Sequence, residues 1–249
     1  MKHIGLWGPS SSGKTVWLAQ LYLRLERMKT DWKIYSVTDE TQKFVELMRG
    51  IMVDRRSFPL GTGETGGAKI EYEFQHPDYP EKLRLFTEDR AGAVSERLGE
   101  DDLKAFEEAS GLMVLLDLDR ENYGSEVRRA LERLYLHARG SQRDGDARPV
   151  VFCVSKADKR IQNYDDYQMA LERPDEFARR QIDADLIEFV ARFCPRHTYF
   201  PVSAAGVQLD FGLVRPAVYY DERLTLRLLP EGLPVHLLTP FEWLFKAIR

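Results

Sequence analysis

The feature that most constrains the fold is a glycine-rich stretch near the start of the sequence. Residues 3–7 are mostly apolar and predict a short buried strand, and the apolar spacing after Thr15 predicts a helix. Between them, Gly8, Gly13, Lys14 and Thr15 match the pattern G-x-x-x-x-G-K-[ST]. A strand, such a loop and a helix in this order are the setting that a phosphate-binding loop requires. The chain is therefore predicted to bind a nucleoside triphosphate.

The spacing of this motif suits the dense negative charge of a triphosphate. Backbone N–H groups of the loop and the positive end of the helix dipole surround the phosphates, and Gly8 and Gly13 permit the close approach. Lys14 is expected to bridge the β- and γ-phosphates, while the hydroxyl of Thr15 completes the coordination of Mg²⁺. The remaining residues expected to bind through this loop are Ser10, Ser11 and Ser12. The motif alone does not select a base.

Composition places the chain among ordinary globular proteins. Its 249 residues, 43% of them hydrophobic, are enough for one large α/β domain with a substantial core. A formal net charge of −4 gives no reason to expect nucleic acid or an anionic membrane as a partner. Cys153 and Cys194 lack metal-ligand spacing, which predicts reduced core thiols and a cytoplasmic location. We expect no transmembrane segment and no signal peptide.

Strand-like and helix-like segments alternate along the sequence. Strands are predicted at 3–7, 33–37, 69–76, 82–87, 111–117, 149–154 and 198–202, and helices at 14–29, 38–52, 98–109, 126–138 and 175–193. This alternation predicts an α/β fold, the three-layer P-loop NTPase fold, with a mainly parallel central sheet, one antiparallel hairpin strand and helices on both faces. Ligands of such sheets bind beyond the carboxyl ends of the strands.

Two candidate phosphate-sensing segments follow the loop. Asp89 and Gly92, after the predicted hairpin, form the pattern D-x-x-G, in which the carboxylate holds Mg²⁺ through water and the glycine amide bonds the γ-phosphate. The glycine-rich loop at 57–67 contains Thr62 and Thr65, and the sequence leaves open which of them reaches Mg²⁺ and the γ-phosphate. The expected catalytic set is Lys14, Thr62, Thr65 and Gly92, and the expected Mg²⁺ ligands are Thr15, Thr62, Thr65 and Asp89.

The order of these motifs over roughly residues 3–206 resembles the Ras-like P-loop GTPases of the translation-factor-related class. The tail at 234–245 is similar to the closing motif of the bacterial double-GTPase subgroup. The resemblance implies a guanine-nucleotide switch that binds GTP or GDP with Mg²⁺, hydrolyses GTP slowly and acts on a protein effector or regulator.

In that family a [N/T]-K-x-D turn recognises guanine. Residues 155–158 read Ser-Lys-Ala-Asp, which matches the turn with Ser155 in place of asparagine. The resemblance implies that Asp158 accepts hydrogen bonds from guanine N1 and N2 while the stem of Lys156 lies over the ring. It also implies that Ser203 and Ala204 stand in for the family's S-A-K turn, whose backbone reaches guanine O6.

One departure from the family bears on catalysis. Many Ras-like enzymes carry glutamine directly after D-x-x-G to orient the attacking water, and here that position is Ala93. Glu88, Arg90, Glu96 or a partner protein are candidates to replace it, although Arg90 equally suits a solvated turn residue. A non-hydrolysing binding module and, more distantly, an ATPase or small-molecule kinase are therefore alternative functions.

The chain is expected to be a single Ras-like GTPase domain over 1–249, with a C-terminal elaboration at about 207–249. Strand-like pieces at 213–220 and 224–229 precede an amphipathic helix at 240–248. Packing against the sheet is the expected role of that helix, and binding of a partner or a membrane surface is the alternative. The charged, tyrosine-rich segment 158–180 is either a partner surface or a solvated helical insertion.

Overall fold

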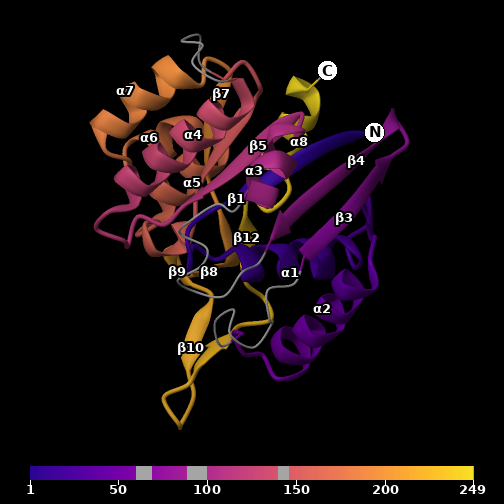
Figure 1. The fold of residues 1–249 in the computed structure, drawn as a ribbon. Helices are drawn as coiled ribbons and strands as arrows, with labels where there is room; N and C mark the ends of the chain where they lie inside the picture. Colours follow the sequence, from indigo (N-terminus) through magenta and orange to yellow (C-terminus); the bar gives the residue numbers. More distant parts are fainter. Residues whose placement is uncertain (60–68, 89–99, 140–145, 249) are drawn as a thin grey trace.

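The computed structural model describes residues 1–59, 69–88, 100–139 and 146–248. Its centre is a seven-stranded sheet in the order β2-β3-β4-β1-β5-β6-β7 (Figure 1). The strands are β1 Lys2–Trp7, β2 Lys33–Ser36, β3 Lys69–His76, β4 Tyr79–Glu88, β5 Gly111–Leu116, β6 Val150–Val154 and β7 His197–Pro201. Only the pairs of β3 with β2 and with β4 are antiparallel, so the predicted mainly parallel sheet with one antiparallel hairpin strand is confirmed.

Helices cover the sheet on both faces. The α-helices of the described chain are α1 Lys14–Leu25, α2 Asp39–Arg49, α3 Glu100–Glu107, α4 Tyr123–Arg139, α5 Tyr164–Glu172, α6 Pro174–Arg179, α7 Ala184–Phe193 and α8 Thr239–Ala247. The central strand β5 shows why both faces must be covered, because its side chains alternate between two hydrophobic clusters. Met113 and Leu115 join the cluster built with α1, α2 and α8, whereas Leu112 and Val114 join the cluster built with α3, α4 and α7.

The start of α2 is set by a local cap. The side chain of Thr38 accepts a hydrogen bond from the backbone N–H of Thr41 at 3.1 Å, so the predicted cap of α2 is confirmed. The helix then changes to a π-helical turn at Gly50–Asp54. The first helix ends at Leu25, four residues before the predicted boundary of 29.

The predicted long helix at 175–193 is wrong. The structure divides it into α6 and α7, with a break between Arg179 and Ala184. At the break the side chain of Ile182 is buried, and the backbone N–H of Asp183 donates to the hydroxyl of Tyr123 at 2.9 Å. A contact with another helix therefore takes the N–H group that a continuous helix would use. Segment 158–180 is also more than a solvated insertion, because Tyr167, Ala170 and Phe177 are buried in a third cluster.

The turn that the resemblance implies at Ser203 and Ala204 is part of a strand in the structure. These residues begin β8 (Ser203–Asp210), which pairs antiparallel with β9 (Leu213–Pro216) and with β12 (Leu233–Val235). Ser203 pairs with Val235 of β12, whereas β9 pairs only from Val207 onward, and Gly206 between them has left-handed backbone with φ of 84°.

The remaining C-terminal elements are a projecting hairpin and a helix that packs against the central sheet. Strands β10 (Val218–Tyr220) and β11 (Leu226–Leu228) form a hairpin that projects from the body of the protein (Figure 1). Phe241, Leu244 and Phe245 of α8 are buried in the same cluster as α1 and α2, so packing of this helix against the sheet is confirmed. The ends of the chain meet there, where the ammonium of Lys2 donates to the carbonyl of Ile248 at 3.1 Å.

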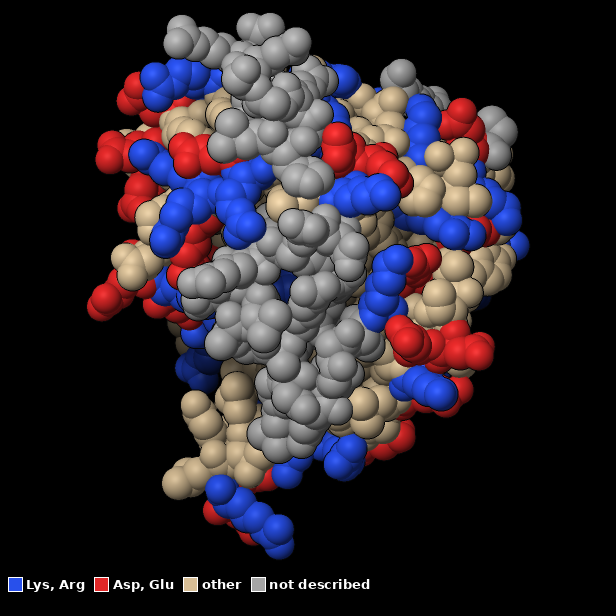
Figure 2. All heavy atoms as spheres, viewed as in Figure 1, with Lys and Arg blue, Asp and Glu red and all other residues tan. Residues whose placement is uncertain are grey.

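Charged side chains of both signs are interspersed over the face of the molecule drawn in Figure 2. Cys153 and Cys194 are both free and buried, as the sequence predicts. Within the described part of the chain, no helix has the length and apolar character that a membrane crossing needs.

Candidate functional site

The loop between β1 and α1 is closed around the ammonium of Lys14. Two of its residues have left-handed backbone, Ser11 with φ of 64° and Gly13 with φ of 88°. Lys14 is only 7% exposed, and its Nζ donates to the carbonyls of Gly8 at 2.6 Å and Pro9 at 3.0 Å. The predicted phosphate-binding loop thus forms where the sequence places it, with a buried cation held by backbone oxygens of the loop itself.

Gly8 and Gly13 are required here for different reasons. A Cβ atom at Gly8 would lie 2.7 Å from Ser12 Oγ and 2.9 Å from the Cβ of Leu115, so a side chain cannot fit. A Cβ at Gly13 would meet no atom within 4 Å, but its φ of 88° is a conformation that other residues adopt only with strain. Close packing fixes the first glycine, and backbone conformation fixes the second.

The start of α1 is suited to an anion. The described residues provide no side-chain cap at Gly13, and the first turn of α1 contains no acidic residue. The partial positive charge of the helix N-terminus is therefore not compensated by its own side chains. Ser12 Oγ is also buried and, among the described residues, lacks a hydrogen-bond partner. These features fit a bound polyanion such as a nucleotide phosphate.

The turn after β6 is held against the neighbouring strand β5. Both the backbone N–H and the hydroxyl of Ser155 lie 2.9 Å from the carbonyl of Leu116 and donate to it. Lys156 has left-handed backbone with φ of 55°, and its Nζ lies 2.8 Å from Oδ2 of Asp117. The side chain of Lys156 is therefore fixed at both of its ends.

Asp158 follows on a short 3₁₀ turn, Ala157–Lys159, and is 7% exposed. Its Oδ1 accepts a hydrogen bond from the hydroxyl of Ser203, which itself accepts from the backbone N–H of Gly206 at 2.9 Å. Burial raises the pKa of Asp158, and the hydrogen bond from Ser203 partly opposes that rise. The structure thus brings Asp158 and Ser203 together through their side chains, a contact that the sequence analysis did not foresee.

The segment that follows β5 lies between the two loops. Arg120 donates to the carbonyl of Ser10 in the first loop at 2.9 Å and pairs with Glu126 of α4 at 2.7 Å. Asp119 pairs with Lys159 at 2.6 Å, beside the second loop. The sequence analysis missed this segment, and its only signal was the acidic residue that ends the predicted strand at 111–117.

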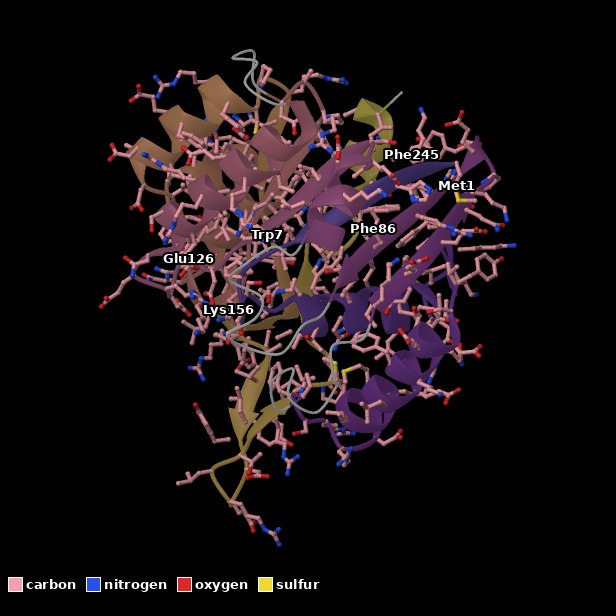
Figure 3. The ribbon with its side chains drawn as sticks, in the orientation of Figure 1. Met1, Trp7, Phe86, Glu126, Lys156 and Phe245 are labelled. Carbon is pink, nitrogen blue, oxygen red and sulfur yellow. The ribbon has the colours of Figure 1, made fainter. Side chains whose placement is uncertain are left out.

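The described side chains of this region gather beyond the carboxyl ends of β1, β5 and β6. Figure 3 draws Trp7, Glu126 and Lys156 in the same part of the molecule, with Met1 and Phe245 away from them. Arg120 contacts Ser10 in the first loop, and Asp117 contacts Lys156 in the second, so the segment after β5 connects the two loops. The predicted position of the site, at the carboxyl ends of the parallel strands, agrees with this arrangement.

The remaining predicted residues lie outside the described residues. They are Thr62, Thr65, Asp89, Arg90, Gly92, Ala93 and Glu96. The strand that precedes Asp89, β4, lies parallel to β1, with Phe86 opposite Gly5. Within the described part of the chain, no group of three or more His, Cys, Asp or Glu residues could hold a metal ion. The Mg²⁺ ligand set therefore remains a prediction, of which only Thr15 is described.

The sequence comparison decides the family. Residues 2–212 match the family Double-GTPase 2. The chain belongs to the Double-GTPase 2 family. The predicted relation to P-loop GTPases of the double-GTPase type is thereby confirmed, and membership implies that the chain binds guanine nucleotide. A comparison with curated proteins found no match. The Double-GTPase 2 match covers both loops described above as well as Ser203, and it ends shortly after β8.

Proposed function

We propose that this Double-GTPase 2 protein is a molecular switch of the cytoplasm that binds GTP and GDP with Mg²⁺ and hydrolyses GTP slowly. The observation that carries the proposal is the pair of loops that follow the carboxyl ends of β1 and β6. One encloses the buried cation of Lys14, and the other presents the buried carboxylate of Asp158. A guanine nucleotide joins a polyanion to a purine that carries N–H donors. The cation of Lys14 suits the phosphates, and the carboxylate of Asp158 suits the donors of the base.

The proposed roles at the phosphate end follow from charge. Lys14 leaves the carbonyls of Gly8 and Pro9 to bind the β- and γ-phosphates, and the backbone N–H groups of residues 10–13 surround the β-phosphate. Thr15 would hold Mg²⁺ together with Asp89 and Thr62 or Thr65, and the ion supplies neutralisation of phosphate charge. As water attacks the γ-phosphate in line, Lys14 and the Gly92 amide stabilise the developing charge.

The proposed roles at the base end use groups that are already positioned. Asp158 accepts hydrogen bonds from guanine N1 and N2, and the stem of Lys156 lies over the ring. Ser203 holds the Asp158 carboxylate, while backbone at Ser203 and Ala204 reaches guanine O6. Because adenine carries a donor where guanine carries that acceptor, this arrangement discriminates against ATP.

A single-turnover assay with γ-labelled GTP tests the reaction. We expect slow release of one phosphate per bound GTP, because Ala93 cannot orient the attacking water. Tight GTP binding without release would contradict hydrolysis and support the second candidate, a non-hydrolysing binding module, which the same alanine favours. Preferential cleavage of ATP would contradict both.

We further propose that residues 1–249 act as one GTPase domain whose elaboration from about 207 onward serves a protein effector or regulator. The β10–β11 hairpin supports this role, because Tyr220 and Leu224 are 69% and 81% exposed. Its base is hydrogen-bonded to residues that precede the threonine-bearing loop, since the N–H of Leu228 donates to Arg56 at 2.8 Å. Pull-down with GDP- and GTP-loaded protein, with and without the change Leu224→Ser, tests it.

A further inference from the structure

Asp117 is a buried carboxylate for which the proposed chemistry has no role. It follows β5, and its side chain is 3% exposed. Its Oδ2 pairs with Lys156 Nζ at 2.8 Å, and its Oδ1 accepts from the backbone N–H of Asp119 at 3.3 Å. A buried ion pair adds little stability over a hydrophobic pair of similar size, because desolvation opposes the attraction. Its value here is the position that it gives to the Lys156 side chain.

Asp119 repeats this arrangement two residues later. Its carboxylate pairs with Lys159 at 2.6 Å and with Arg160 at 2.9 Å. The hydrogen bond from Lys159 lowers the pKa of Asp119, which favours the ionised carboxylate that both pairs require. Lys159 and Arg160 directly follow Asp158 in the chain, so the base-reading residues are held at both ends of their turn.

Arg120 extends the same segment in the other direction. Its Nη1 donates to the carbonyl of Ser10 at 2.9 Å, and its Nη2 pairs with Glu126 at 2.7 Å. The side chains of Arg120 and Glu126 are 25% and 19% exposed, so the pair is shielded from much of the solvent. The guanidinium therefore joins the phosphate loop to α4 by hydrogen bonds of fixed geometry.

We infer that the segment 117–120 couples the phosphate loop to the base-reading turn, with Asp117 and Arg120 as positioning residues for guanine nucleotide. Asp117 orients the stem of Lys156 that covers the base, and Arg120 fixes the loop that binds the phosphates. The inference rests on the proposed function of this site as the guanine-nucleotide site. It predicts that a change in either residue weakens binding of the whole nucleotide while leaving the choice of base intact.

Equilibrium titration of the full chain with GTP, ITP and XTP tests this inference. Asp117→Asn keeps the size of the side chain and removes its charge. We expect the Kd values for GTP and ITP to rise by the same factor, about tenfold, because Lys156 contacts the ring rather than the 2-amino group. Arg120→Gln should raise both Kd values about tenfold as well. The preference for GTP over XTP should stay unchanged in both variants.

The double variant measures the coupling directly. Because both residues act through one segment, Asp117→Asn combined with Arg120→Gln should raise Kd about twentyfold, well below the roughly hundredfold product of independent effects. Glu176→Gln and Arg180→Gln are matched controls, because Glu176 of α6 and Arg180, which directly follows α6, form an exposed ion pair. Both controls should bind GTP like the wild type.

The outcomes separate this inference from the proposed function. A wild-type chain that fails to bind GTP contradicts the proposed function. If the wild-type chain binds GTP and the Arg120→Gln variant binds it with the same affinity, the inferred coupling is overturned while the proposed function stands. The coupling is also overturned if the rise in Kd of the double variant equals the product of the rises in the two single variants. If Asp117→Asn lowers the melting temperature of the nucleotide-free protein so far that it cannot be titrated, the partly exposed Arg120 still provides the test.

Discussion

The proposed phosphate loop, residues 8–15, and the proposed base-reading turn, residues 155–158, are built in opposite ways. In the phosphate loop, Lys14 contacts carbonyls only five and six residues away. In the base-reading turn, Lys156 contacts Asp117 across 39 residues, and Asp158 contacts Ser203 across 45. In the first, the buried cation is held by carbonyls of its own stretch of sequence, although Arg120 also donates to Ser10 of this loop from 110 residues away. The second exists only after β5, β6 and β8 have been assembled, so it depends on the complete fold.

This difference predicts how substitutions in the two regions affect nucleotide binding. In the local loop, a substitution acts directly on the ligand contact or on the backbone beside it. In the assembled turn, a substitution acts through a partner that lies elsewhere in the chain. The predictions below use this contrast, and they run from the largest expected effect to the smallest.

Lys14→Ala should nearly abolish nucleotide binding. The variant loses a charge-assisted contact to each of two phosphates, worth about 4 kcal/mol in total, which corresponds to roughly a thousandfold rise in Kd. Titration with a fluorescent GTP analogue measures it, and Lys43→Ala, an exposed lysine on α2, is the control. A Kd within about threefold of the wild type would contradict the role of Lys14.

Asp158→Asn should change which base is bound rather than whether phosphates are bound. An amide presents both a donor and an acceptor, so it pairs with xanthine better than with guanine. We expect GTP affinity to fall by about 3 kcal/mol and XTP affinity to rise above that for GTP. Competition between GTP and XTP measures the reversal. An unchanged preference for GTP would show that Asp158 does not read the base.

Ser203→Ala should shift the pH dependence of GTP binding. Binding needs the ionised Asp158 carboxylate, whose pKa is raised by burial and lowered by the Ser203 hydroxyl. GTP affinity of the wild type should therefore fall as the pH falls through that raised pKa, above the ordinary value of 3.8. Without the hydroxyl the pKa rises further, so the midpoint of the loss moves to higher pH.

The expected cost of Ser203→Ala at neutral pH is about 1 kcal/mol of binding free energy. Titrations at a series of pH values give the midpoint for each variant. Asp158→Asn, which has no carboxylate to titrate, should lose this pH dependence altogether. A midpoint that stays in place in Ser203→Ala would contradict the side-chain contact between Ser203 and Asp158.

Ser12→Ala should have the smallest effect on stability. The hydroxyl is buried without a partner among the described residues, so its removal relieves an unsatisfied polar group. We expect the free energy of unfolding without nucleotide to stay within about 0.5 kcal/mol of the wild type or to increase. Denaturant unfolding measures this. A loss of about 2 kcal/mol would indicate a hydrogen bond that the buried hydroxyl makes in solution.

The same contrast explains what the sequence could predict. The phosphate loop was predictable because Gly8, Gly13 and Lys14 are close together in the chain and their spacing has a direct chemical reason. The sheet was predictable because apolar runs alternate with amphipathic ones. Both signals are contained in windows of a few residues.

What could not be predicted depends on contacts between distant residues. The break between α6 and α7 comes from Tyr123, and the extended backbone at Ser203 comes from β12. The pair of Asp117 with Lys156 requires β5 and β6 to lie side by side. A short window contains none of these partners, so it predicts a continuous helix at 175–193 and gives no sign of the partner of Lys156.

The central claim is that the two loops form one site for a guanine nucleotide. Titration of the nucleotide-free chain with GTP and with ATP, each with Mg²⁺, tests it most directly. The account predicts tight binding of GTP and about a hundredfold weaker binding of ATP, because two charge-assisted hydrogen bonds to Asp158 are lost with adenine. Equal affinity for the two nucleotides, or tighter binding of ATP, would contradict it.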